Sequence, residues 1–131
     1  MNAFVPFDTN LENGVLGALI LTPEVYPKIR DFLSTDEVFH QKKSRMLWKK
    51  LKSMLDREEF IDLNTVTATL TDEDMNKGLN HIYVVDCTMS TGVSSSAPAY
   101  ARKLYEKYLL RKVVEETQKI QDSAMDNSNE T

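Results

Sequence analysis

The sequence predicts an all-α protein, built as a compact bundle of short helices followed by one long helix that projects from it. Two observations predict this class. Apolar residues recur at steps of three and four in most segments, which places them on one face of a helix. Residues 100–124 contain no Gly or Pro and are rich in strong helix formers. We therefore expect the bundle over residues 1–93, a loop over 94–99, the long helix over 100–125, and a disordered tail or the start of a linker over 126–131.

The first helix is predicted to begin near Thr9, which has capping-box spacing to Glu12. An arm over residues 1–8 precedes it. Within the helix, Gly14 and Gly17 each weaken helical structure by up to about 1 kcal/mol relative to Ala. Their presence therefore indicates that another helix packs closely against this one.

Capping signals mark the elements that follow. Pro23 favours a turn and a short helix up to residue 33, and Ser34 with Glu37 forms a second capping box. Further along, Asp62 and the acidic stretch 71–74 are typical helix starts, and Gly78 is a typical helix end. Each of these signals predicts a boundary between short helices.

Two segments in the middle of the chain differ in their patterns. Residues 44–55 show a clear helical period, with Leu47, Trp48 and Leu51 on the core face. Residues 79–89 include adjacent β-branched and aromatic residues that would suit a strand. Because no other segment offers a strand for pairing, we predict that 79–89 is also a helix.

The long helix carries the predicted self-association surface. At ~1.5 Å per residue it would be about 37 Å long, more than a bundle of this size covers. Part of its apolar stripe should therefore meet something outside the domain. The alternative is that the stripe is core in the first half and that the rest frays in solvent. The residues predicted to self-associate are Leu104, Tyr105, Tyr108, Leu109 and Val113.

Composition bounds the class of protein. The chain has 131 residues, with 41% hydrophobic and 27% charged residues, as expected for one globular domain. No apolar run approaches the ~20 residues needed to span a bilayer, and the start lacks the pattern of a signal peptide. The single cysteine, Cys87, suits a reducing cytoplasm. A net charge of −4 argues weakly against a dedicated nucleic-acid-binding protein.

One face of the helix over 44–55 and the residues just before it are basic. This face has three readings: a solvated surface, a docking site for an acidic partner, or a contact with a nucleic-acid backbone. Surface charge alone does not choose among them. The candidate partner-binding residues are Lys42, Lys43, Arg45, Lys49, Lys50 and Lys52.

The residues that usually carry chemistry are scarce. No Gly-rich phosphate loop is present, and His40, His81 and Cys87 have no spacing typical of a zinc site. The serines at 94–96 are more typical of a linker than of a nucleophile paired with a base. The sequence therefore predicts no catalytic residue, no cofactor and no metal in this chain.

Four stretches carry a resemblance to a known family. Residues 12–19 are similar to a Glu-x-x-Val-Leu-Gly-x-Leu motif, and residues 33–48 to Leu-x-x-x-x-Phe-Tyr followed by a helix with Ile-Phe. Residues 61–66 fit Ile-Asp-x-x-Thr-Val, and 100–111 resemble Tyr-Ala-x-x-Ile-x-Glu-x-x-x-Leu-Arg. In this order they resemble the N-terminal domain of DnaB-type replicative DNA helicases.

The resemblance covers nearly the whole chain, with three departures. Ser44 stands nearest to a histidine of the family pattern, and Leu79-Asn80 replaces a Gly-Gly pair. The second helix of the family's hairpin should begin about where this chain ends. The departures suggest a divergent member, such as a phage-type one.

The resemblance implies an all-α domain of a hexameric ring, in which N-terminal domains pair through helical hairpins into a collar. That collar docks primase and takes part in control by the helicase loader. The ATPase motor, with its ATP and Mg²⁺ and most of the DNA contacts, would lie in a separate C-terminal domain. Two rival classes stay open: a stand-alone primosome adapter, such as a loader or the helicase-binding domain of primase, and a small DNA-binding protein.

Overall fold

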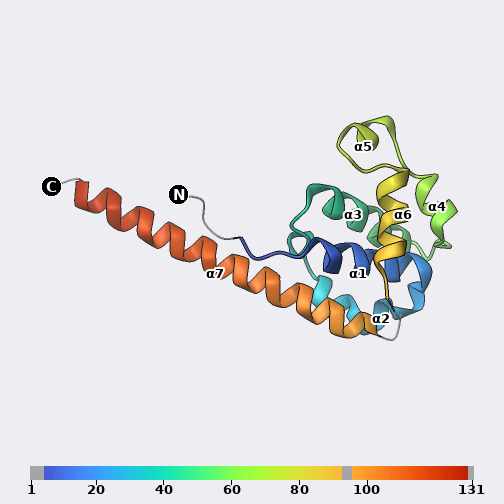
Figure 1. Cartoon of the computed structure of the whole chain (residues 1–131), viewed down its shortest axis with the longest axis horizontal. Helices are drawn as coiled ribbons and strands as arrows, with labels where there is room; N and C mark the ends of the chain where they lie inside the picture. Colours follow the sequence, from blue (N-terminus) through green and yellow to red (C-terminus); the bar gives the residue numbers. More distant parts are fainter. Residues whose placement is uncertain (1–4, 93–95, 130–131) are drawn as a thin grey trace.

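The computed structural model describes residues 5–92 and 96–129, and this part of the chain contains helices and connecting segments without a strand. The prediction of an all-α fold is confirmed. Figure 1 shows a cluster of short helices from which one long helix extends. The α-helices are α1 (Thr9–Leu21), α2 (Tyr26–Ile29), α3 (Lys42–Asp56), α4 (Leu63–Thr67), α5 (Asp72–Asn76), α6 (His81–Ser90) and α7 (Ala97–Asn129). Three 3₁₀ turns join them: η1 (Pro23–Val25), η2 (Arg30–Leu33) and η3 (Asp36–Val38).

Helix α1 is the centre of the bundle. It packs against α3, α6 and α7, and every residue from 12 to 20 except Asn13 is buried. A Cβ atom on Gly17 would overlap the carbonyl oxygen of Cys87 in α6, and one on Gly14 would lie 3.3 Å from the carbonyl oxygen of Ser90. The predicted close approach of a second helix is therefore confirmed, and that helix is α6.

The helix starts show which capping predictions hold. Asp62 and Thr71 cap α4 and α5 as expected, each in a reciprocal capping box. The predicted cap Thr9 is wrong: Asp8 caps α1 instead, with its Oδ1 accepting from the backbone N–H of Leu11 at 3.1 Å. The predicted cap Ser34 is also wrong, because Thr35 caps η3. Each error is one residue, since two capping side chains stand next to each other in both places.

The segment predicted as a helix despite its strand-like composition is α6. Asn80 caps it by accepting from the backbone N–H of Tyr83 at 2.9 Å. Tyr83, Val84 and Cys87 are buried against the rest of the bundle. Burial of one helical face therefore overrides the β preference of these residues. Gly78, with φ of +96°, ends the turn before it as expected.

The long helix is longer at both ends than the sequence predicted. It begins at Ala97, within the expected loop 94–99, and continues to Asn129, through most of the expected tail. Pro98 is compatible with this start because the first helical turn needs no N–H from it. Residues 94, 95, 130 and 131, and the first four residues of the predicted arm, lie outside the described part. At ~1.5 Å per residue, the 33 residues of α7 extend for about 50 Å.

Candidate interaction surfaces

The first half of α7 is part of the bundle. Ala97, Ala101 and Leu104 belong to the same buried core as α1 and α3. Leu104 is only 1% exposed, so its predicted place on a self-association surface is wrong. Tyr105 and Tyr108 are partly buried beside that core, with ring centroids 5.9 Å apart. Only part of each ring is therefore accessible for the self-association predicted for these two residues.

The second half of α7 leaves the bundle. Every residue from 115 to 127 is exposed, and Figure 1 shows this part of α7 extending beyond the other helices. It carries large apolar side chains in solvent: Val113 is 62% exposed and Ile120 is 70% exposed. Leu109, at 44% exposed, stands at the transition. Leu109 and Val113 are therefore accessible, as the prediction of self-association requires.

Helical geometry explains why the predicted single stripe divides in two. A step of four residues overshoots one turn by about 40°. Along the row Ala101, Tyr105, Leu109 and Val113 the side chains therefore rotate from the bundle toward solvent. We refer to Leu109, Val113, Ile120 and Ala124 as the distal stripe.

Arg111 connects α7 to two other segments through hydrogen bonds. Its guanidinium donates to the carbonyl oxygens of Pro6 at 2.9 Å, Glu37 at 2.8 Å and Val38 at 3.1 Å. The residue is 6% exposed, and this burial lowers the pKa of the guanidinium below its ordinary value. Arg111 therefore joins the N-terminal arm and η3 to the point where α7 leaves the bundle.

Glu12 plays a similar part at the start of α3. Its buried carboxylate accepts from the backbone N–H groups of His40 and Gln41, both at 3.0 Å. This carboxylate lies where the helix dipole favours negative charge, ahead of Lys42 and Lys43. Glu12 is therefore a tertiary anchor between α1 and α3, and the predicted local role in a capping box at Thr9 is wrong.

A hydrogen-bonded network continues from Glu12 into α6. The Tyr83 hydroxyl donates to Asn13 Oδ1 at 2.8 Å and lies 2.6 Å from Ser44 Oγ. The Gln41 side-chain amide donates to Ser44 Oγ at 3.1 Å. Desolvation raises the pKa of the Tyr83 phenol well above its ordinary value. The network fixes the mutual positions of α1, α3 and α6.

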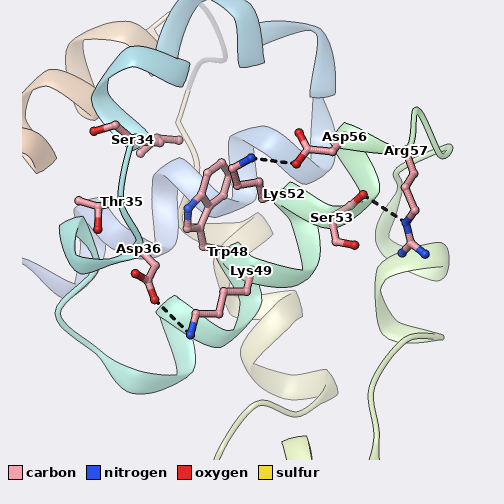
Figure 2. Close-up of a pocket in the computed structure, with 10 residues that line it drawn as sticks. Ser34, Thr35, Asp36, Trp48, Lys49, Lys52, Ser53, Asp56 and Arg57 are labelled. Atoms are coloured by element: carbon pink, nitrogen blue, oxygen red, sulfur yellow. Dashed lines mark hydrogen bonds and ion pairs between the residues drawn. The ribbon is translucent and has the colours of Figure 1, made fainter.

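The basic face of α3 is largely neutralised by carboxylates. Lys49 pairs with Asp36 at 3.2 Å, and Lys52 pairs with Asp56 at 2.8 Å. The two carboxylates come from η3 and from α3 itself. Figure 2 shows both pairs beside a cleft that Trp48 also lines. The cleft has a volume of about 560 Å³.

On the other side of α3, Lys50 reaches the carboxylate of Asp74 at 2.8 Å and the carbonyl oxygen of Thr69 at 3.2 Å. Its ammonium lowers the pKa of Asp74. Lys43 lies over the ring of Tyr83, 4.7 Å from the centroid. Of the six predicted residues, Lys42 and Arg45 are the two whose side chains make no ion pair or ring contact with the described residues.

The residues considered for chemistry are dispersed. Within residues 5–92 and 96–129, no three His, Cys, Asp or Glu side chains could together hold a metal ion. Burial raises the pKa of the Cys87 thiol to about 12, and the His40 ring packs on Phe7 with centroids 4.3 Å apart. Ser94 and Ser95 lie outside the described part. None of the described helices combines the length and apolar character needed to cross a membrane.

Comparison with known proteins identifies the family. Residues 5–106 match the model of the DnaB-like helicase N terminal domain. The chain belongs to this family. A solved structure, the N-terminal domain of DnaB helicase from Mycobacterium tuberculosis, has the same fold, with a TM-score of 0.85 over 93% of this chain and 88% of that one, at 22% identity.

Two curated relatives are named as replicative DNA helicases. DnaB of Rhodothermus marinus is 28% identical over 84% of this chain, and DnaC of Bacillus subtilis (strain 168) is 28% identical over 83% of it. The chain spans only 12% and 24% of these relatives. The suspected resemblance to DnaB-type N-terminal domains is therefore confirmed.

The family motifs also contain the two anchors that helical periodicity missed. Glu12 opens the first motif, and Arg111 ends the fourth. The periodicity of apolar residues gives neither of them a place in the core because both are charged. Their position within motifs was the available signal that each one has a specific partner elsewhere in the fold.

Proposed function

We propose that this chain is the N-terminal assembly module of a replicative DNA helicase and is not catalytic by itself. Family membership supports this proposal, and so does the fact that both curated relatives are replicative DNA helicases. Since the chain spans a small part of those relatives, the ATPase motor, with its ATP and Mg²⁺ and most DNA contacts, would lie in a separate domain. A Gly-x-x-x-x-Gly-Lys-Ser/Thr motif encoded after Thr131 would support this arrangement.

The observation that carries the assembly role is the distal stripe of α7. Val113 and Ile120 are large apolar side chains that α7 exposes to solvent by 62% and 70%. Burial of such a side chain stabilises an interface by about 1.5–3 kcal/mol. An isolated, solvent-exposed helix is marginal in water unless another surface packs on it. Self-association through this stripe would supply that surface.

The experiment compares apolar-to-lysine changes on and off the stripe. Val113→Lys and Ile120→Lys, separately and together, are measured by sedimentation equilibrium with Gln118→Lys as the control. Lys is a good helix former, so none of the changes weakens α7 as a helix. We expect the double variant to weaken self-association at least ~100-fold, since two buried side chains are lost. The control, on the opposite side of α7, should leave it unchanged.

Two results would contradict this proposal. One is equal self-association of the double variant and the control. The other is a loss of thermal stability as large as the loss of assembly, because the stripe would then be ordinary core.

We also propose that primase or the helicase loader docks on the bundle, with an acidic segment near the unpaired cations Lys42 and Arg45. Lys42→Glu should weaken binding of the primase or loader from the same genome. Lys49→Glu should weaken it less, because Lys49 already pairs with Asp36. Isothermal titration of the two variants against that partner tests this, and equal affinities would exclude docking at this end of α3.

A further inference from the structure

A small polar pocket lies where the N-terminal end of α3 meets the middle of α7. It has a volume of about 100 Å³, the scale of a few water molecules or one small ion. Most of its lining is polar and comes from three places in the chain: η3 with the residues after it, α3 and α7. The basic side chains that line it are His40, Arg45, Arg111 and Lys112.

Two carboxylates also line the pocket, and both lie near the same lysine. Lys112 Nζ lies 3.7 Å from the Glu37 carboxylate and 3.6 Å from the Glu115 carboxylate. Both carboxylates raise the pKa of Lys112. Their side chains are 58% and 57% exposed, so water screens them strongly. These three side chains together carry one net negative charge, so with the two arginines the pocket keeps one net positive charge.

The arginines are not matched in the same way. Arg111 donates to the three neutral carbonyl oxygens described above, and the side chain of Arg45 makes no hydrogen bond or ion pair with any described residue. Burial lowers the pKa of Arg111, and the charge of Arg45 lowers it further, while Glu12 and Glu115 oppose this. Two guanidinium groups of like charge therefore line one pocket, and an anion beside Arg45 would offset its repulsion of Arg111.

We propose that this pocket binds a single oxyanion, either a phosphate group or a carboxylate, held chiefly by Arg45. A guanidinium is weakly hydrated and presents a planar fork of donors that fits both groups. The bound anion would bridge α3 and α7 beside the Arg111 contact. This site is separate from the distal stripe of α7, so its test is independent of the assembly role.

The test uses the chain 1–131 with sodium phosphate as the probe. Sodium chloride is adjusted at each phosphate concentration so that the ionic strength stays constant. The thermal midpoint of unfolding should rise with phosphate and saturate, since a ligand that binds only the folded state stabilises it. Arg45→Gln should weaken phosphate binding by about tenfold or more, the loss expected for a charge-assisted hydrogen bond. Lys49→Gln removes the same charge one turn along α3 and should bind phosphate as the native chain does.

A rise that does not saturate, or that is equal in Arg45→Gln and Lys49→Gln, would overturn the proposal, because it would reflect general screening. If Arg45→Gln does not fold, Arg45→Lys takes its place; it keeps the charge but loses the fork, and unchanged affinity in it would also overturn the proposal. Sodium acetate distinguishes a phosphate ligand from a carboxylate ligand. Saturation by phosphate alone assigns a phosphate ligand, and saturation by acetate as well assigns the acidic side chain of a partner.

Discussion

From Ala97 to Arg111, α7 lies against the bundle, whereas from residue 115 to 127 every side chain is exposed. Both halves are rich in helix formers and both carry apolar residues at helical steps. They differ in where the apolar row points, because the row turns around the helix by about 40° at each step of four. The comparison teaches that one periodic pattern can provide core at one end of a helix and an accessible surface at the other.

The largest expected effect is on the bundled half. Leu104→Ala should lower the free energy of unfolding by about 3 kcal/mol, because it removes buried methyl groups and leaves a cavity in the core. Leu109→Ala, on the turning row of the same helix, should lower it by less than about 1 kcal/mol. Urea unfolding of the two variants measures the difference, and similar losses would mean that the two halves do not differ as described.

The next effect concerns the junction between the halves. Arg111→Met should lower the free energy of unfolding by about 2 kcal/mol, because the carbonyl groups of Pro6, Glu37 and Val38 lose a charged donor. Arg111→Lys keeps the charge without the fork and should fall between Met and the native residue. Chemical unfolding checks the order. A loss under about 0.5 kcal/mol in Arg111→Met would show that the contact contributes little.

The smallest effect on stability is expected from the exposed half. Removal of residues 116–131 should change the free energy of unfolding of the monomer by less than about 1 kcal/mol, since none of the described residues 116–127 is buried. The same truncation should abolish self-association if the distal stripe forms the interface. Unfolding at a concentration too low for association measures the stability of the monomer. Sedimentation at higher concentration measures self-association separately. A large loss of monomer stability would contradict the comparison.

Much of the fold could be predicted from local patterns. The helices at α1, α3, α6 and α7, the Gly17 approach and the Gly78 turn all follow from spacing and residue type. Patterns failed where a side chain finds its partner far along the chain. Glu12 was assigned to its own helix but binds the start of α3, and the lysines of α3 formed an apparent basic patch until Asp36 and Asp74 from other elements paired with them.

The candidate self-association surface on α7 was predicted only in part, because its exposure also depends on contacts far along the chain. The sequence indicated that α7 is too long for the bundle, and Leu109 and Val113 are exposed as expected. It could not show where the apolar row turns away, because that depends on the angle at which α7 packs. Leu104 was therefore assigned to the wrong side.

The contact between Arg111 and Pro6 joins residues that are 105 positions apart. During synthesis, residues 5–8 have emerged long before their partner exists. At ~5–20 residues per second, the ribosome adds Arg111 roughly 5–20 seconds after Pro6. For most of that interval the core also lacks Ala97, Ala101 and Leu104. The domain therefore reaches its native state only after nearly all of its length has been translated, and until then α1 exposes the surface that α7 will cover.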